Sequence, residues 1–180
     1  MHKLKSLLVV FALCMCAGPA FAETALEWVH LGNVAGREEK YKEAIKDYTQ
    51  AIGMDPNIPN AYYNRGYVYM KMRKYKLAGK DLDHATALRP NYSAAHHLRG
   101  ILYFYRKKYT QAIAEYNDAL EVEPNNIRYH ISRMSAYFKL GNGDGAWREV
   151  IQIQKLGGTV NPTIVNMLKA KYYRGQSDGR

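Results

Sequence analysis

The sequence has few of the residues that form disulfides or act as catalytic nucleophiles. It contains two cysteines, Cys14 and Cys16, and both lie within the first 22 residues. The rest of the chain therefore has neither disulfides nor thiolate chemistry. It also lacks a G-x-S-x-G segment, a glycine-rich phosphate loop and an H-E-x-x-H motif. These absences argue against an enzyme, and we predict no catalytic residues and no cofactor.

The first 22 residues have the layout of a secretory signal peptide. Lys3 and Lys5 precede an apolar run over 7–17, and residues 20–22 read Ala-Phe-Ala, a small-x-small cleavage pattern. The apolar run is shorter than the roughly 20 residues that a membrane-spanning helix needs. We expect cleavage after Ala22, no transmembrane segment in the mature chain, and export to the periplasm or beyond. Neither cysteine has the small residues before it that a lipoprotein signal needs, so lipid anchoring is the less favoured alternative.

Residues 59–126 consist of two stretches that match each other 34 residues apart. The segment A-Y-Y-N-R-G-Y-V-Y from Ala61 corresponds to A-H-H-L-R-G-I-L-Y from Ala95. Other residues keep this spacing over a longer range: Gly32, Gly66 and Gly100; Ala44, Ala78 and Ala112; Ala51, Ala85 and Ala119; Tyr41, Tyr75 and Tyr109; Pro56, Pro90 and Pro124. A fixed period of this length indicates stacked supersecondary units. Small residues suit close helix crossings, so we interpret each unit as a helical hairpin.

The units resemble the tetratricopeptide repeat, with its pattern W-x2-L-G-x2-Y, then A-x3-F, then A and P. The first unit supplies Trp28, Leu31 and Gly32. The fourth keeps Tyr137 and Ala146 but lacks the glycine and the proline. The resemblance implies an all-α, right-handed α-solenoid of stacked antiparallel hairpins. The expected organisation is three clear repeats (25–58, 59–92 and 93–126), one degenerate repeat (127–160), and a capping helix with a tail (161–180), with residues 23–160 forming one repeat domain.

The helix boundaries are predicted from helix-breaking residues and from the spacing of apolar residues. We expect them at about 25–38, 41–54, 59–72, 75–88, 93–106 and 109–122. In the fourth unit the second helix is expected at 146–156, after a glycine-rich turn, and the capping helix at 161 to about 173. Proline disfavours helical geometry in the residue before it, and so separates the units at Pro56, Pro90 and Pro124.

Four histidines lie in the middle of the chain: His84, His96, His97 and His130. No acidic residue stands three or four positions after any of them, and His96 and His130 occupy the slot that holds Trp28 and Tyr62 in the other units. We therefore interpret these two rings as core packing and predict no metal site.

The resemblance also implies a binding surface, because the first helix of each hairpin lines the inner groove of such solenoids. Carried over position by position, the groove residues are Asn33, Asn60, Tyr63, Asn64, Tyr67, Met70, His97, Ile101, Phe104, Arg128, Ile131, Ser135 and Phe138. Tyr and Met are frequent at protein-binding surfaces. The groove is expected to bind a peptide or helix of a partner protein, although packing against neighbouring repeats would also explain part of the pattern.

Some family members bind a chaperone's C-terminal carboxylate with a clamp of two asparagines and three basic residues. Asn33 and Asn64 match the asparagines, but Val29, Ala94 and Leu98 stand at the basic positions. The resemblance therefore does not extend to that clamp.

Positive charge is concentrated in the turns between the paired helices. Without Lys3 and Lys5 the chain has 24 basic and 16 acidic side chains, a formal charge of +8. We expect the turns to align as a basic ridge of Lys71, Arg73, Lys74, Lys76, Arg106, Lys107 and Lys108. Such a field would attract an acidic partner or an anionic envelope surface, although exposed turns commonly carry lysine. An exported protein meets little nucleic acid, so we predict no nucleic-acid partner.

These features predict a non-enzymatic scaffold or adaptor of a bacterial-type cell envelope, which binds a partner in its groove, in the assembly of an envelope complex. The first alternative is a structural or surface-binding protein that attaches to anionic envelope material through the basic ridge. The second is a regulator of a cell-wall enzyme. The sequence leaves the partner and the oligomeric state open.

Overall fold

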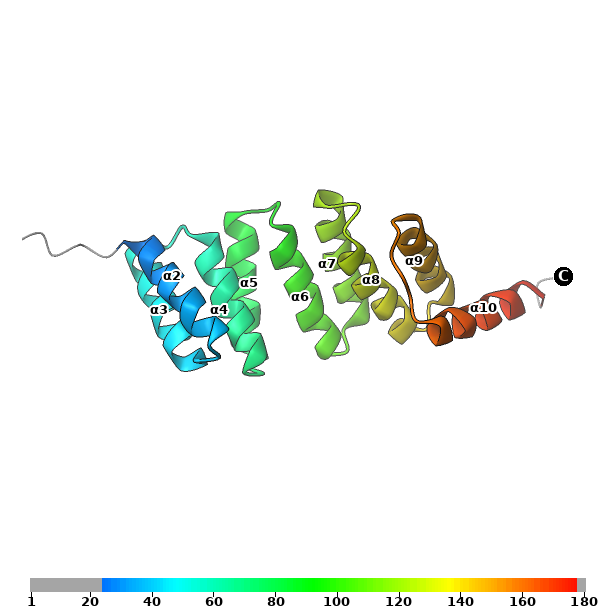
Figure 1. The fold of residues 1–180 in the computed structure, drawn as a ribbon, viewed down its shortest axis with the longest axis horizontal. Helices are drawn as coiled ribbons and strands as arrows, with labels where there is room; N and C mark the ends of the chain where they lie inside the picture. The colour runs from blue at the N-terminus through cyan, green and yellow to red at the C-terminus, as the bar shows by residue number, and fades with distance from the viewer. Residues whose placement is uncertain (1–23, 178–180) are drawn as a thin grey trace, which may run out of the picture.

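The computed structural model describes residues 24–177, with side chains through residue 170, and every regular element in this range is an α-helix. The helices are α2 (Ala25–Arg37), α3 (Tyr41–Met54), α4 (Pro59–Lys71), α5 (Tyr75–Leu88), α6 (Ser93–Tyr105), α7 (Tyr109–Val122), α8 (Ile127–Leu140), α9 (Gly143–Lys155) and α10 (Pro162–Ser177). They follow one another along an elongated stack (Figure 1). This confirms the predicted solenoid of helical hairpins. The predicted signal peptide, residues 1–22, lies outside the described residues.

Most helix boundaries agree with the sequence-based expectation. The six helices of the first three hairpins begin where predicted and end within one residue of the predicted ends. In the fourth hairpin the prediction was wrong, because α9 begins three residues early, at Gly143. The Asn142 side chain accepts a hydrogen bond from the Gly145 backbone N–H at 2.8 Å and so caps the helix before the second glycine. The last helix, α10, continues to Ser177, beyond its predicted end.

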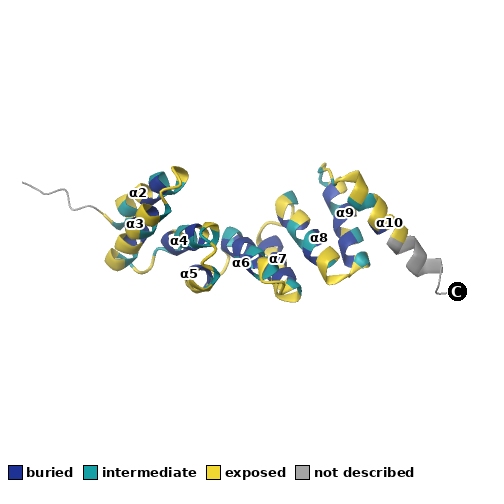
Figure 2. Ribbon diagram, turned by 90° about the horizontal axis from the view of Figure 1, so that it is seen from below, coloured by how far each residue is buried: buried dark blue, intermediate teal, exposed yellow. Residues whose placement is uncertain are grey.

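The core of each hairpin is a seam of small residues against large ones. Ala44, Ala78 and Ala112 are fully buried, and the rings of Tyr48 and Tyr116 pack against the backbone of the facing helix. A Cβ atom built on Gly100 would lie 2.4 Å from Tyr116, which no real contact allows. Buried residues accordingly gather where helices face one another (Figure 2). The 34-residue series of small residues therefore marks the closest helix crossings.

The turn within each of the first three hairpins contains a residue in the left-handed conformation. Glu39, Arg73 and Lys107 have φ values of 58°, 59° and 59°, and Gly141 occupies the matching place in the fourth hairpin. After α6, the Lys107 N–H donates to the Phe104 carbonyl and the Lys108 N–H to the Tyr103 carbonyl, both at 2.9 Å. This pair of bonds is the Schellman motif, which ends the helix sharply. The motif sets the direction in which the chain, with its basic turn residues, continues after the helix.

One side of the stack is more compressed than the other. The first helices of successive hairpins touch, α2 with α4, α4 with α6 and α6 with α8, whereas the second helices α3, α5 and α7 do not touch each other. The side formed by the first helices is therefore the concave face, as predicted. Among the described residues, no helix has the length and apolar character that crossing a membrane requires.

Two glycine substitutions test the seam. Gly100→Ala should lower the free energy of unfolding by about 1–3 kcal/mol, because the added methyl group meets the buried Tyr116 ring. Gly53→Ala is the matched control: Gly53 lies in α3 with no atom within 4 Å of its added Cβ, so the free energy should rise by about 0.5–1 kcal/mol. Urea unfolding followed by circular dichroism measures both, and equal effects would contradict the seam.

Candidate functional site

Two adjoining hollows lie on the concave face at the turn end of α2, α4 and α6. The first, of about 420 Å³, is lined by Asn33, Gly36, Arg37, Glu39, Tyr41, Tyr48, Asn64, Tyr67, Val68 and Lys71. The second, of about 460 Å³, is lined by Tyr67, Met70, Lys71, Arg73, Tyr75, Leu98, Ile101 and Tyr105. Tyr67 and Lys71 line both hollows, which therefore adjoin, and we call the pair of hollows the trough.

Two asparagines from neighbouring repeats meet in the first hollow. The side-chain oxygen of Asn33 accepts a hydrogen bond from the Tyr48 hydroxyl and another from the Asn64 side-chain N–H, each at 2.8 Å. Burial raises the pKa of Tyr48 to about 12, so its hydroxyl keeps its proton and remains a donor. Both bonds within residues 24–170 use the oxygen of Asn33, which leaves its N–H groups to donate to a ligand.

Cationic side chains surround these amides. Arg37 lines the first hollow, Arg73 lines the second, and Lys71 lines both. The Lys71 ammonium lies 5.4 Å from the centre of the Tyr67 ring, and the hydrogen bond to the Tyr67 hydroxyl raises the pKa of this lysine. Glu39 is the acidic side chain among the trough residues. Three cations against one carboxylate give the side chains that line the trough a net positive charge.

The second hollow combines these charges with an apolar floor. Met70 comes from α4, and Leu98 and Ile101 come from α6. Tyr75 and Tyr105 stack at a ring-centre distance of 6.3 Å and close the outer end. This arrangement would accept an apolar side chain next to a charged group.

The structure brings five of the predicted groove residues together in the trough: Asn33, Asn64, Tyr67, Met70 and Ile101. Other predicted positions on the concave helices lie outside it. Tyr63 is partly buried against Tyr92, with ring centres 5.1 Å apart, and the exposed Asn60 accepts a 3.3 Å hydrogen bond from Arg89. Phe104 packs edge-on against Tyr109. These side chains shape the edges of the groove.

The part of the predicted groove on α8 forms a separate surface. Ile131 and Phe138 are each 37% exposed, and Arg128 is exposed beside the Tyr129 ring. The Ser135 hydroxyl donates to the Ile131 carbonyl within the helix at 2.9 Å. Phe138 also lines a smaller hollow of about 240 Å³ beneath Met167 of α10. The predicted strip is therefore interrupted, and the trough contains residues only from the part of it that lies on α2, α4 and α6.

The structure places His97 in the core, although its sequence position suggested the groove. Its ring lies 4.5 Å from the Tyr129 ring centre and 5.6 Å from that of Tyr116, and it is hydrogen-bonded to Ser132 at 2.9 Å. Only 8% of the residue is exposed. Burial, helped by the charge of Arg128, lowers the pKa of His97 to about 4. The ring is neutral at physiological pH and offers little surface to a ligand.

The sequence reasoning missed several trough residues because they lie outside the inner-groove positions of the repeat. Arg37 is at the end of α2, Tyr48 reaches in from α3, and Tyr75 begins α5. The spacing of Arg37 and Lys71, one period apart, was the available signal. The predicted basic ridge divides in the structure: Lys71 and Arg73 line the trough, whereas Lys74, Lys76, Arg106, Lys107 and Lys108 are exposed and line neither hollow.

Arginines one period apart join successive hairpins by hydrogen bonds. Arg65 donates to both carboxylate oxygens of Asp81 at 2.8 Å and to the Thr49 hydroxyl of the preceding hairpin at 3.0 Å. Arg133 donates in the same way to Glu149 at 3.0 Å and to Asn117 at 2.7 Å. We call this series, with Arg99 between them, the arginine ladder.

The predicted burial of His96 and His130 is confirmed, but both rings have acidic partners that the sequence analysis missed. His96 lies 3.1 Å from Glu115, and His130 lies 2.7 Å from Glu149. Each acid is 19 positions after its histidine, on the other helix of the hairpin. A search three or four positions along one helix could not find them.

Comparison with known proteins supports the repeat assignment. A model described as "TPR repeat" matches residues 32–72 and 100–141, and one described as "Tetratricopeptide repeat" matches 59–92. Hsp70-Hsp90 organizing protein 1 of Arabidopsis thaliana is 51% identical over 41 residues, which are 23% of this chain and 7% of that protein. The chain thus matches a small part of that relative's length.

Solved structures show the same architecture. The first TPR of Spaghetti (RPAP3), bound to the HSP90 peptide SRMEEVD, superposes with a TM-score of 0.65 at 32% identity and covers 67% of this chain and 95% of that one. A crystal structure of MamA gives a TM-score of 0.72 at 22% identity and covers 75% and 79%. The MamA likeness concerns the fold alone.

The buried His97 generates a pH prediction. Between about pH 6.5 and pH 4 the unfolded chain binds a proton on His97 that the folded chain excludes, so stability falls as the pH falls. At pH 5 this loss is about 2 kcal/mol relative to pH 7. His97→Gln should remove it, so the wild-type protein should lose about 2 kcal/mol more than the variant between these pH values in urea unfolding. An identical pH dependence would show that His97 titrates normally in the fold.

Proposed function

The chain belongs to the tetratricopeptide repeat family, and from this premise we propose that it is a non-enzymatic scaffold or adaptor that binds an acidic peptide segment of a partner protein in the trough. The observation that carries the proposal is the shared wall of the two hollows, where Tyr67 and Lys71 join an amide-lined, cationic site to an apolar one. Repeats of this fold typically serve as protein-interaction modules.

The first hollow supplies the groups that a carboxylate needs. A carboxylate there would accept hydrogen bonds from the amide N–H groups of Asn33 and Asn64 and pair with Arg37 or Lys71. Hydrogen bonds to charged groups contribute about 1.5–3 kcal/mol each when partly shielded from water. Asn33 is fixed by Tyr48 and Asn64, so little side-chain entropy is lost on binding.

The second hollow would take the neighbouring residues of the same peptide. Its apolar wall of Met70, Leu98 and Ile101 suits an aliphatic side chain, and Arg73 suits a second carboxylate. An extended peptide advances about 3.3 Å per residue. A segment that contains both acidic and aliphatic residues therefore fits the trough better than a uniformly acidic segment.

The relative that binds SRMEEVD supports this class of ligand, since that peptide combines acidic residues with methionine and valine. The present chain differs at the three clamp positions named above, Val29, Ala94 and Leu98, of which Val29 and Leu98 are buried. In our proposal Arg37 and Lys71 replace their charges from other positions on the wall. The preferred peptide sequence would therefore differ from that of the relative.

We further propose that the protein acts in a cell envelope, where it holds a partner for assembly of a complex. This part rests on the signal-peptide layout of residues 1–22, with the expected cleavage after Ala22. A second candidate function is attachment to anionic envelope material through the outer part of the ridge. It is favoured by Lys74, Lys76, Arg106, Lys107 and Lys108, which are exposed outside the trough.

Paired lysine variants distinguish these functions. The labelled peptide SRMEEVD is a suitable probe, measured by fluorescence anisotropy. Lys71→Ala should weaken its binding about 5- to 30-fold, because one charge-assisted hydrogen bond is lost and exposure of Lys71 to water reduces the contribution of that bond. Lys107→Ala removes an equally exposed turn lysine outside the trough and should change the affinity less than about twofold.

The peptide SRMQQVN, with its acidic side chains converted to amides, serves as the ligand control and should bind more weakly than SRMEEVD. Equal losses for Lys71→Ala and Lys107→Ala would contradict the trough and favour the ridge. If neither SRMEEVD nor SRMQQVN binds at millimolar concentration, the proposal that an acidic peptide of this kind is the ligand is wrong.

A further inference from the structure

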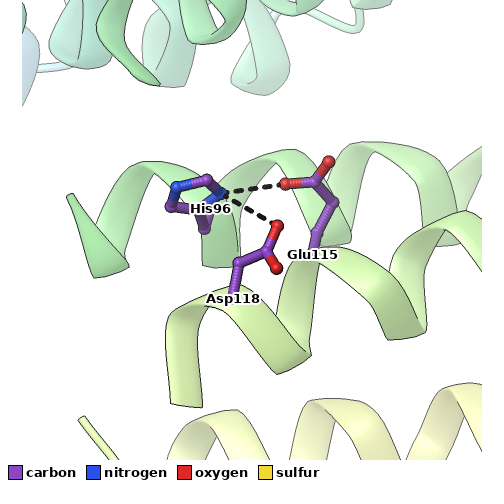
Figure 3. Close-up of side chains that lie close together, drawn as sticks. All are labelled: His96, Glu115 and Asp118. Carbon is purple, nitrogen blue, oxygen red and sulfur yellow. Dashed lines mark hydrogen bonds and ion pairs between the residues drawn. The ribbon is translucent and has the colours of Figure 1, made fainter. Parts of the chain in front are cut away.

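The third hairpin holds a histidine and two carboxylates that converge at one point. His96 extends from α6, and Glu115 and Asp118 extend from successive turns of α7 (Figure 3). We propose that these three side chains form a binding site for a divalent transition-metal ion of the zinc class. The site is separate from the trough and does not depend on the proposed function.

The distances fit metal coordination. The His96 Nδ1 atom lies 3.1 Å from the Glu115 Oε2 atom and 3.6 Å from the Asp118 Oδ2 atom, and all three atoms lie within 4.8 Å of one another. Ligand atoms at about 2.0–2.2 Å from a tetrahedral zinc ion are separated by about 3.4 Å. Shifts of a few tenths of an ångström would therefore bring the two nitrogen-to-oxygen distances to this value.

The other nitrogen of the ring fixes its tautomer. His96 Nε2 lies 2.8 Å from the Pro90 carbonyl, which can only accept, so this nitrogen carries a hydrogen. Nδ1 then faces two carboxylates, and a positive species must lie between them: a proton or a metal ion. Metal-binding histidines commonly donate their second N–H to a backbone carbonyl, as here.

The charges around the site favour a divalent cation over the proton alone. Arg99 Nε lies 2.8 Å from Glu115 Oε2, while its Nη1 donates to Asp83 at 3.2 Å and to Thr86 at 2.9 Å. Arg99 thus pairs with the carboxylates of Asp83 and Glu115, and the carboxylate of Asp118 lies beside the His96 ring, so the cluster contains one guanidinium and three carboxylates. With a neutral imidazole this group has a formal charge of −2, which a divalent ion neutralises.

The fourth hairpin provides an internal comparison. His130 Nδ1 lies 2.7 Å from Glu149, and its Nε2 lies 2.9 Å from the Pro124 carbonyl, so two of the three ligands repeat. One period after Asp118, however, stands Gln152, and one period after Asp83 stands Asn117. The cluster around His130 therefore lacks both additional acids, and Arg133 balances the charge of Glu149.

Burial suits a site with access from one side. His96 and Glu115 are buried, whereas about half of the Asp118 side chain is exposed. An ion would reach the site past Asp118 and retain water at the remaining coordination position. Imidazole and carboxylate ligands together suit Zn²⁺ and Co²⁺, whereas Mg²⁺ and Ca²⁺ prefer oxygen ligands alone. Bound metal would fasten α6 to α7.

Protons and metal compete for His96. The hydrogen bond with Glu115 raises the pKa of His96, so a proton occupies Nδ1 more readily than in a free histidine. Metal binding must displace this proton, and the zinc affinity should therefore decrease as the pH is lowered.

Calorimetric titration of the full chain with Zn²⁺ at pH 7.5 tests the site. We expect one ion per chain, with at least a tenfold weaker affinity in Asp118→Asn, whose exposed side chain leaves folding intact. Gln152→Asp should create a second site on His130 and Glu149 and raise the stoichiometry to two. The double variant, Asp118→Asn with Gln152→Asp, should bind one ion, and this ion should lie in the fourth hairpin. Mg²⁺ at the same concentrations should give no binding heat.

A second measurement reports the site directly. In nitrogen-15 NMR spectra of the imidazole groups, the Nδ1 signal of His96 in the wild-type protein should shift at Zn²⁺ concentrations that leave this signal unchanged in Asp118→Asn. Cys14 and Cys16 are present in every variant, so any zinc they bind contributes equally. Unchanged affinity and stoichiometry in Asp118→Asn would overturn the proposal, as would the absence of zinc binding by the wild-type protein at millimolar concentration.

Discussion

The structure depends on the close crossing of two helices at residues without bulk. Gly100 lies directly against Tyr116, and Gly32 lies in the same way against Tyr48, at 2.6 Å from an added Cβ atom. Because the glycines at these crossings recur every 34 residues in the first three hairpins, these hairpins pack on their neighbours in similar ways. The first helices then lie closer together than the second ones, and the concave face follows from that asymmetry.

The arginine ladder fixes how successive hairpins are oriented relative to one another. Each arginine contacts its own hairpin through a carboxylate and the preceding hairpin through an oxygen atom, as Arg65 does with Asp81 and Thr49. Apolar seams tolerate small rotations, whereas a two-sided hydrogen-bonded contact between charged groups favours one orientation. The ladder therefore holds α4 and α6, two of the helices that line the trough, in fixed positions relative to the helices before and after them. The third hairpin departs from the pattern at Glu115, where the extra acids Asp83 and Asp118 gather.

Much of the fold follows from local signals in the sequence, whereas the site depends on contacts across hairpins. Pro56, Pro90 and Pro124 and the glycine series locate the first six helices to within a residue, but the early start of α9 depends on one capping bond from Asn142. Asn33 and Tyr67 reach the trough as expected from the family pattern. Residues outside that pattern, such as Arg37, can be assigned to the trough only from the three-dimensional arrangement of the turns. For His97 the family position was misleading, because the rings of Tyr116 and Tyr129 enclose it.

The central claim is that ligands bind in the trough of the concave face rather than on the outer helices. The most direct measurement is the change in backbone amide NMR shifts when unlabelled SRMEEVD peptide is added to the isotope-labelled protein. We expect the largest changes at Asn33, Asn64, Tyr67 and Ile101, which line the trough. Changes concentrated on the exposed faces of α5 and α7, or at the turn residues Lys107 and Lys108, would contradict it.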